Sequence, residues 1–308
     1  MNRVAKSLFR LSMRKEPPGT LSALVGDYAE LAQRCERLQA EHNQLMSRCS
    51  ELNKEIQAVS QRCLQLAAQA EQSRSGGVNG GDVLGKMRAD WDERARLNAL
   101  YYTNTAKFDW DDKEYFETGE QNIREHILTD MTNICQGDHP SGMRILEIGC
   151  GAGRMTKALA RIFGEVHAVD ISGEMIAIAR RNLADISNVR FWQNNGMDLS
   201  VIPAQPFDFA LSFIVFQHIP SVEVIQSYLR EVWRLLKPGR LFKFQVQGWC
   251  PPEGQPLDTW IGTGFTVEAM QRMASDCGFE MRSWYGAGTQ EFWVWFFKKD
   301  ATAAPRPA

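Results

Sequence analysis

Residues 143–154 read Met-Arg-Ile-Leu-Glu-Ile-Gly-Cys-Gly-Ala-Gly-Arg. An apolar run that ends in three alternate glycines before a helix-like segment predicts a buried strand, a tight turn and a helix. Glycines at such a turn let a ligand approach the bare backbone at the carboxyl end of the strand. The stretch therefore predicts an α/β domain with a ligand site at this turn, although a purely structural turn would have the same pattern.

The chain around this turn alternates between helix-like and strand-like runs. Helices are predicted at residues 88–104, 112–135, 153–163, 173–184, 221–236 and 266–277. Strands are predicted at residues 143–148, 165–170, 189–193, 207–213, 241–247, 279–285 and 290–298. Strands separated by helices predict a mostly parallel sheet, whereas the last two strands follow each other directly and are expected to be antiparallel neighbours.

Composition and charge limit the classes of protein to which the chain can belong. The chain has 308 residues, of which 44% are hydrophobic and 23% are charged, and its formal net charge is −2. These values are typical of a globular protein and argue against a general nucleic-acid binder. No apolar run reaches the ~18 residues of a transmembrane helix, so no integral membrane segment is expected. Seven scattered cysteines without zinc-ligand spacing predict no disulfide framework and no metal site, and they favour the cytoplasm.

Composition also divides the chain into five segments. We expect a basic flexible arm, a coiled coil, a Gly/Ser linker, the α/β domain and a disordered tail, at residues 1–20, 21–72, 73–85, 86–299 and 300–308 respectively.

The second segment repeats mostly apolar side chains every seven positions, in two sets that alternate by steps of three and four. One set is Leu24, Leu31, Leu38, Leu45, Leu52, Val59 and Leu66, and the other is Tyr28, Cys35, His42, Cys49, Ile56, Cys63 and Ala70. Such a stripe predicts a coiled coil and requires a partner helix, from a second copy or from another protein. The positions just before the second set (g of the heptad) carry charges of alternating sign, and the positions just after the first set (e) are uncharged. This pattern favours an antiparallel homodimer, while a parallel pair and a merely solvated charged face remain alternatives.

Two carboxylates accompany the glycine turn. Glu147 lies two residues before Gly149, at a strand end where a carboxylate needs a partner such as the amine of a ligand. Asp170 closes the next strand, where it can accept hydrogen bonds from both hydroxyls of a ribose, with a helix N-cap as the alternative role. The turn spacing is Gly-x-Gly-x-Gly, and Arg154 stands where a dinucleotide-binding turn has its third glycine. A nicotinamide oxidoreductase is therefore the weaker interpretation.

From about residue 143 to residue 247 the chain resembles the class I S-adenosylmethionine-dependent methyltransferases. The resemblance rests on the turn, on Asp170, on Asn194-Asn195-Gly196-Met197-Asp198-Leu199, on Phe207-Asp208 and on Leu236-Lys237-Pro238-Gly239. It is closest to small-molecule methyltransferases of the ubiquinone and menaquinone biosynthesis type. It implies a Rossmann-like sheet of seven strands with an antiparallel last strand, S-adenosyl-L-methionine as cofactor, and methyl transfer to a small-molecule, glycan or lipid-type acceptor.

The resemblance also implies which residues bind the cofactor. These are Glu147, Gly149, Cys150, Gly151, Gly153, Asp170, Ile171, Met175, Asn195, Gly196, Met197 and Phe213. Among them, Glu147 would neighbour the ammonium group of the donor and Asp170 would hold its ribose. Asn195 stands where the family commonly has an acidic residue that bonds the adenine amino group, and this departure leaves its role open.

His218 is the candidate catalytic residue, because it follows the fourth strand and could act as a general base for a hydroxyl or enol acceptor. Packing or helix capping is the alternative role for this histidine. The acceptor pocket is expected to draw on aromatic residues of three segments: Trp91, Tyr101, Tyr102, Trp110 and Tyr115; Trp249 and Trp260; and Trp284, Tyr285 and Trp293. The favoured interpretation is a methyltransferase, and the alternative is a coiled-coil scaffold with a vestigial methyltransferase-like domain.

Overall fold

The computed structural model describes residues 83–252 and 257–299, together with scattered residues between 33 and 48. The chain divides into two units, residues 1–78 and residues 79–308. In the first unit the described residues are helical, and Leu38, a predicted core position, is 56% exposed in the single chain. The other heptad core positions, the basic arm, most of the linker and the tail lie outside the described residues.

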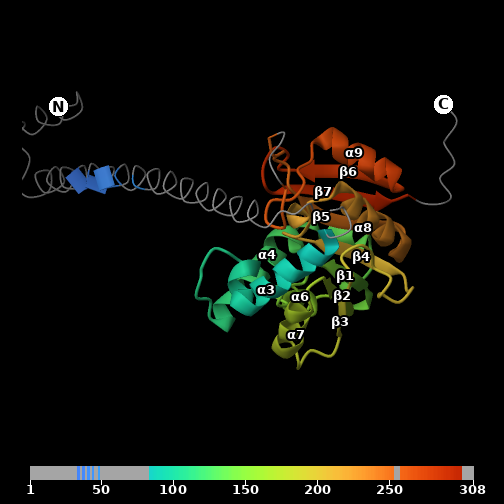
Figure 1. Ribbon diagram of the computed structural model, residues 1–308, viewed down its shortest axis with the longest axis horizontal. Coiled ribbons are helices and arrows are strands. Elements are labelled where there is room, and N and C mark those ends of the chain that lie inside the picture. Colours follow the sequence, from blue (N-terminus) through green and yellow to red (C-terminus); the bar gives the residue numbers. More distant parts are fainter. Residues whose placement is uncertain are drawn as a thin grey trace, which may run out of the picture. The chain divides into compact units, whose positions relative to one another are not determined.

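The second unit is built on a seven-stranded sheet with the order β3-β2-β1-β4-β5-β7-β6 (Figure 1). Its strands are β1 Arg144–Ile148, β2 Glu165–Asp170, β3 Val189–Gln193, β4 Phe207–Ser212, β5 Leu236–Val246, β6 Phe279–Tyr285 and β7 Phe292–Lys298. Neighbours from β3 to β5 are parallel, whereas β7 runs antiparallel to both β5 and β6. The predicted α/β class, the mostly parallel sheet and the antiparallel end are confirmed.

Helices precede the first strand and connect most of the later strands. They are α3 Val83–Thr103, α4 Asp112–His126, η1 Leu128–Asp130, α5 Met131–Cys135, η2 Pro140–Gly142, α6 Thr156–Leu159, α7 Gly173–Asn182, η3 Phe216–His218, α8 Val222–Leu235 and α9 Val267–Asp276. Side chains cap several of them: Ser172, Ser221 and Thr266 each accept a hydrogen bond from a backbone amide in the first turn. None of the described helices is long and apolar enough to cross a membrane.

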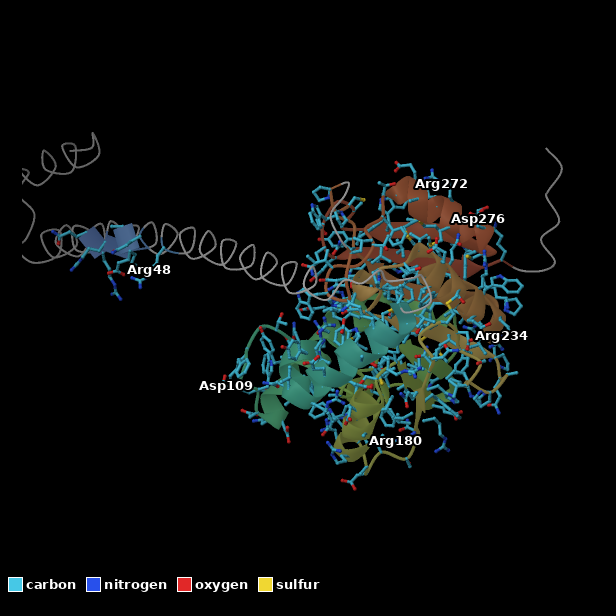
Figure 2. All side chains as sticks on the ribbon, viewed as in Figure 1. Arg48, Asp109, Arg180, Arg234, Arg272 and Asp276 are labelled. Atoms are coloured by element: carbon cyan, nitrogen blue, oxygen red, sulfur yellow. The ribbon has the colours of Figure 1, made fainter. Side chains whose placement is uncertain are left out.

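Helices cover both faces of the sheet, and two hydrophobic cores fill the space between the layers (Figure 1). One core packs α8 and α9 against the sheet, and the other packs α4, α5, α6 and α7 against the opposite face. Successive residues of β1 divide between the two cores, since Leu146 belongs to the first and Ile145 to the second. Charged side chains such as Asp109, Arg180 and Arg272 lie at the surface (Figure 2).

Three elements differ from the sequence-based expectation. The predicted helix at 112–135 is divided into α4, η1 and α5. The predicted helix at 153–163 contracts to the single turn of α6, because the residues before it continue the glycine turn and those after it form further turns. The predicted helix at 221–236 ends at Leu235, and β5 begins at once at Leu236. The Pro238-Gly239 pair therefore lies inside β5, beside a register shift between Phe207 and Phe209 of β4. Such an irregularity accommodates a proline that has no amide hydrogen to give to the ladder.

The parallel pairing brings the carboxyl ends of β1, β2 and β4 to one edge. Ile148 pairs with Val169 on one side and with Ser212 on the other. Helix α3 lies against α7, where Asp92 Oδ1 accepts hydrogen bonds from Ser172 Oγ at 2.6 Å and from the Glu174 amide at 3.3 Å. This edge is where open α/β sheets bind ligands.

Candidate active site

The glycine turn after β1 has a backbone that other residues would not tolerate. Gly149 has φ +76° and Gly151 has φ +52°, in the left-handed region that favours glycine. A Cβ atom at Gly149 would lie 2.1 Å from a methyl group of Val215, and one at Gly151 would lie 2.7 Å from a methyl group of Thr103. Gly153, with φ +88°, differs in that it does not line the pocket, and a Cβ atom there would lie 2.8 Å from a methyl group of Leu183. The first two glycines open a pocket, and the third permits close packing.

Glu147 is a buried carboxylate at the base of this pocket. Its side chain is 5% exposed, and Oε2 accepts a hydrogen bond from Thr156 Oγ1 at 2.6 Å. Burial raises the pKa of the Glu147 carboxyl to about 7, against the lowering effect of the Thr156 hydrogen bond and of Arg154 nearby. The guanidinium of Arg154 donates instead to Thr118 and Asn122. Glu147 thus lacks a direct cationic partner among the described residues.

Asp170 joins the ends of β1 and β2. Its carboxylate accepts hydrogen bonds from the amides of Gly151 and Ser172, each at 2.9 Å. Burial raises its pKa to about 6, although these backbone hydrogen bonds act in the opposite direction. Each amide occupies one lone pair of one carboxylate oxygen, so Asp170 can still accept hydrogen bonds from a ligand in the pocket.

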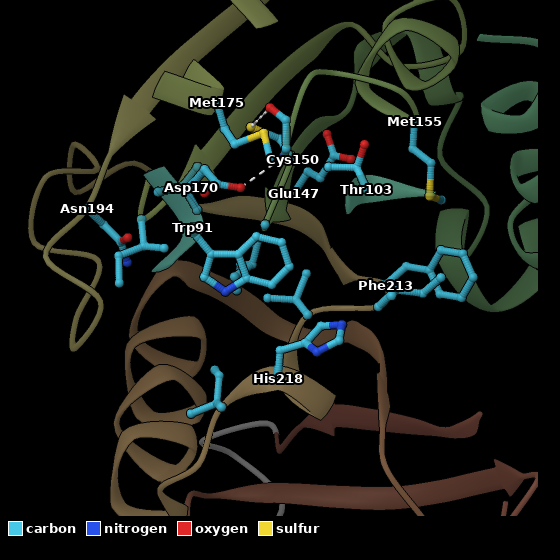
Figure 3. A pocket seen from close by; sticks show the side chains of 18 of the residues that line it. Trp91, Thr103, Glu147, Cys150, Met155, Asp170, Met175, Asn194, Phe213 and His218 are labelled. Carbon is cyan, nitrogen blue, oxygen red and sulfur yellow. Dashed lines mark hydrogen bonds between the residues drawn. The ribbon is translucent and has the colours of Figure 1, made fainter. Parts of the chain in front are cut away.

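Side chains of α3 close one side of the pocket. Met87, Trp91, Tyr102 and Thr103 line it together with the turn residues, and Figure 3 shows Trp91 between Asp170 and His218. Trp91 and Tyr102 were expected in an acceptor pocket; the structure places them at this pocket.

A polar latch ties α3 to the segment before α9. Arg94 donates to the carbonyl and to Oγ1 of Thr259, both at 3.0 Å, and Thr259 Oγ1 donates to Asp90 at 2.5 Å. The Arg94 guanidinium lies 4.7 Å from the ring centre of Trp91 and 5.2 Å from that of Trp260. These contacts hold residues 257–261 beside the rim of the pocket.

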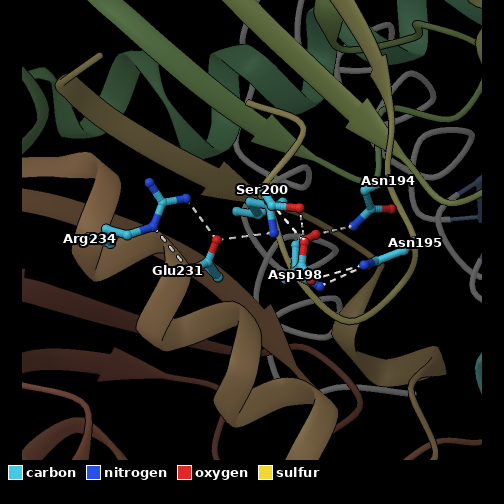
Figure 4. A network of polar contacts seen from close by, with 7 residues as sticks. Asn194, Asn195, Asp198, Ser200, Glu231 and Arg234 are labelled. Carbon is cyan, nitrogen blue, oxygen red and sulfur yellow. Dashed lines mark hydrogen bonds and ion pairs between the residues drawn. The ribbon is translucent and has the colours of Figure 1, made fainter. Parts of the chain in front are cut away.

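Two successive asparagines follow β3, and the side-chain amide of each donates a hydrogen bond to Asp198 (Figure 4), but their other surroundings differ. Asn194 is buried and lines the pocket; its Nδ2 donates to the Tyr228 hydroxyl at 2.6 Å, while its Oδ1 has no hydrogen-bond partner in the described part of the chain. Asn195 is exposed, and its Oδ1 accepts from the amides of Met197 and Asp198 in a local turn. Asn194, and not Asn195, therefore lines the pocket, and its buried amide oxygen is without a partner among the described residues.

His218 lines the pocket with both ring nitrogens engaged. Its Nδ1 lies 2.8 Å from the carbonyl oxygen of Trp260, and its Nε2 lies 3.2 Å from Nε2 of Gln217. Because Gln217 Oε1 accepts from Gln245, the Gln217 amide nitrogen is the donor and His218 Nε2 is the acceptor. Burial lowers the pKa of His218 to about 4, so the ring is neutral at physiological pH. Its contacts hold the Trp260 segment in place.

The pocket includes most of the cofactor-binding residues expected from the sequence. Those that line it, together with His218, are Glu147, Gly149, Cys150, Gly151, Asp170, Ile171, Met175 and Phe213. Gly153, Asn195, Gly196 and Met197 lie outside its lining. Sequence reasoning missed Asn194 and Tyr228 as pocket residues, and only the direction of their side chains distinguishes them from their neighbours.

Comparison with known proteins shows which family the second unit is similar to. Residues 145–239 match a family described as methyltransferase domain. Over 101 residues the chain is 32% identical to the ubiquinone biosynthesis O-methyltransferase of Xanthomonas axonopodis pv. citri (strain 306), covering 32% of this chain and 41% of that protein. The chain thus spans about two fifths of the length of this curated relative.

Solved structures share the fold at low sequence identity. Phosphoethanolamine N-methyltransferase 1 of Haemonchus contortus, in complex with phosphoethanolamine and S-adenosylhomocysteine, aligns with a TM-score of 0.54 and 14% identity, covering 75% of this chain and 52% of that one. Magnesium protoporphyrin IX methyltransferase of Synechocystis PCC 6803, with bound S-adenosylmethionine, aligns with a TM-score of 0.51 and 14% identity, covering 73% of this chain and 100% of that one. Residues 145–239 therefore match a methyltransferase domain, and the unit has the Rossmann-like fold of the two solved methyltransferases.

Proposed function

We propose that this unit binds S-adenosyl-L-methionine in the pocket beside the glycine turn and methylates a small-molecule acceptor. The observation that carries the proposal is Glu147, a buried carboxylate with a raised pKa and no direct cationic partner among the described residues. The ammonium group of a bound donor would supply the missing positive charge.

Other groups of the pocket fit the same ligand. Asp170 has acceptor capacity for the two hydroxyls of a ribose. The unpartnered Oδ1 of Asn194 would accept a hydrogen bond from the adenine amino group, the contact that the family's acidic residue at the position of Asn195 commonly makes. Ile171 and Met175 also line the pocket and would contact the adenine ring.

The protein's own contribution to the reaction is alignment and exclusion of water. The bound sulfonium supplies an already activated methyl group, so little covalent help is needed. Trp91 and Met87 of α3 cover the pocket, and the Arg94–Thr259 latch holds its rim. His218, expected as a general base, is assigned to positioning, because both its nitrogens are hydrogen bonded and its pKa is about 4.

A titration with S-adenosylhomocysteine by calorimetry tests the donor site. We expect wild-type protein to bind in the micromolar range, and Asp170→Ala and Gly151→Val to abolish binding. Asp185→Ala, an exposed carboxylate after α7, is the matched control and should bind as wild type does. A folded wild-type protein that does not bind would refute the enzyme and favour the vestigial scaffold.

We further propose that residues 21–72 form a coiled coil with a second copy of the chain or with another protein. The seven-residue spacing supports this, as does the exposure of Leu38 in the single chain. Light scattering on the full chain should give twice the monomer mass for a homodimer, and Leu38→Glu should reduce it. A monomeric wild type would leave only a heterologous partner. The cytoplasmic location stays a prediction of the cysteine pattern.

A further inference from the structure

The backbone is strained where the chain leaves β4 and enters the wall of the donor pocket. Ile214 has φ +55°, in the left-handed region that residues with a branched Cβ atom rarely adopt. Such a conformation costs free energy and persists only where the surrounding structure enforces it. In the described part of the chain, Gln136 is the other non-glycine residue with a positive φ, and it ends α5. The strain at Ile214 therefore requires a contact that holds it.

The strained residue belongs to the wall of the donor pocket. Phe213, Ile214 and Val215 all line this pocket, which Figure 3 shows with Phe213 labelled. Val215 also lies against the glycine turn so closely that Gly149 has no room for a Cβ atom. A change of the backbone at Ile214 would therefore move both of its neighbours, and with them the surface that a bound donor meets.

A buried glutamine holds this conformation. Gln245 of β5 is fully buried, and its Oε1 accepts a hydrogen bond from the Ile214 amide at 2.9 Å. The sheet register explains the contact, because Phe244 pairs with Ser212, the last residue of β4. Gln245 thus lies beside the point where the chain leaves the sheet, and its oxygen fixes the direction of the Ile214 amide.

The amide nitrogen of Gln245 fixes the orientation of the same side chain. Nε2 donates to Oε1 of Gln217 and to the carbonyl oxygen of Gln290, each at 2.7 Å. Both of these oxygens can only accept a hydrogen bond, so the amide of Gln245 cannot turn over. Its oxygen must therefore face Ile214.

The same contacts continue to the rim of the pocket. Gln217 Nε2 donates to His218 Nε2, and His218 Nδ1 donates to the carbonyl oxygen of Trp260. The donors of this chain all point one way, from Gln245 through Gln217 and His218 to Trp260. Gln245 is thus connected both to the wall after β4 and to the segment that the polar latch holds.

An apolar side chain would serve the core equally well at this position. The neighbouring residues Leu241, Phe242, Phe244 and Val246 of β5 all belong to the hydrophobic cores. A buried amide costs free energy unless its polar atoms are hydrogen bonded. Because the oxygen of Gln245 binds the pocket wall, we attribute this amide to the site and not to the core.

We propose that Gln245 is a positioning residue of the methyltransferase, which holds Ile214 in its strained conformation and so shapes the donor pocket. The proposal rests on the proposed donor site. Without the hydrogen bond, Ile214 would relax to a negative φ, and Phe213 and Val215 would shift with it. The donor would then meet a wall that is no longer preorganised, so its affinity would fall.

Calorimetric titration with S-adenosylhomocysteine tests this role. Gln245→Met keeps the approximate shape of the side chain and removes its hydrogen bonds, so it should weaken binding about tenfold. Gln247→Met is the matched control, because Gln247 is also buried and its amide donates one long hydrogen bond, 3.4 Å, to the Gly262 carbonyl oxygen. This control should bind within about twofold of the wild type. Equal binding by Gln245→Met and the wild type would overturn the proposal.

A second substitution distinguishes positioning from a general loss of packing. Glycine adopts a positive φ without strain, so Ile214→Gly should need no support from Gln245. We expect Gln245→Met to weaken binding about tenfold in the wild-type background and less than about threefold in the Ile214→Gly background. An equal loss in both backgrounds would mean that Gln245 does not act through the conformation of Ile214, and this result would overturn the proposal.

Residue-resolved hydrogen exchange of the wild type tests the contact even where a variant fails to fold or to bind. The Ile214 amide should exchange as slowly as the amides of β4, because its acceptor is fully buried. Exchange as fast as that of exposed loops would overturn the proposal. A folded wild type that binds no S-adenosylhomocysteine overturns the donor site instead, so the two failures are distinguishable.

Discussion

Replacing Glu147 by glutamine should stabilise the ligand-free domain while it removes donor binding. The wild-type carboxyl is 5% exposed, and its pKa is about 7 in the folded chain against 4.5 for the free group. Because the pKa of Glu147 is higher in the folded state, the folded protein keeps this proton to a higher pH than the unfolded chain does. Ionisation of Glu147 therefore lowers the free energy of unfolding. This destabilisation is absent well below pH 4.5 and complete above pH 7.

The size of this cost follows from the pKa difference. At pH 8 it amounts to about 3 kcal/mol, and at pH 5.5 it is about 1.5 kcal/mol. A neutral amide carries no such cost and can keep a hydrogen bond to Thr156 Oγ1. The Glu147→Gln variant should therefore exceed the wild type in free energy of unfolding at pH 8, and the excess should shrink by about half at pH 5.5.

Urea unfolding followed by tryptophan fluorescence measures this difference. All nine tryptophans lie between residues 91 and 295, so the signal reports the second unit. Glu117→Gln is the matched control, since the Glu117 side chain is 60% exposed beside Lys113 and should change stability by less than about 0.5 kcal/mol. Equal stability of the Glu147→Gln variant and wild type at pH 8, or an excess independent of pH, would refute the assignment of Glu147 as a buried charge awaiting a cationic ligand.

Three further outcomes are expected. Asn194→Ala should weaken S-adenosylhomocysteine binding about tenfold in calorimetry, because its free Oδ1 is the proposed adenine contact. Thr259→Val should lower the free energy of unfolding by about 1–3 kcal/mol and speed hydrogen exchange of residues 257–265, because it removes both hydrogen bonds of Oγ1 in the latch. Phe296→Ala should cost about 3–5 kcal/mol in urea unfolding, since this fully buried ring packs 4.9 Å from that of Phe244.

Two of these outcomes have a control variant, and the third has a result that would contradict it. Asn195→Ala should leave the affinity within about twofold, and a larger effect than that of Asn194→Ala would return the adenine contact to Asn195. Unchanged exchange in Thr259→Val would mean that the latch does not hold the segment. Tyr285→Ala, a 72% exposed position, should change stability by less than about 0.5 kcal/mol, and a cost as large as that of Phe296→Ala would contradict the core assignment.

The elements of this fold could be predicted from local signals. Ser221 caps α8 at the start of the helix predicted there, and the apolar run from 143 to 148 before the glycines forms β1. Such features depend on side-chain periodicity, capping and backbone preference, which are properties of a few neighbouring residues. The same holds for Gly149 and Gly151, whose positive φ angles follow from the turn itself.

Side-chain direction at the site was decided by packing. Asn194 and Asn195 are identical in type and adjacent, yet only Asn194 lines the pocket, because Tyr228 of α8 binds its amide from the core side. Gly153 belongs to the glycine pattern but serves the contact with Leu183. No local signal separates such cases, since each depends on an element distant in the chain.

The sequence by itself determined the α/β class, the order of the elements, the glycine turn and the carboxylates that accompany it. Tertiary structure alone decided that His126 meets Trp293 and Phe213, residues far apart in the chain, at the border of the donor pocket. The physical reason is that periodicity and backbone preference act over a few residues, whereas a cavity forms where distant layers meet and leave space between them.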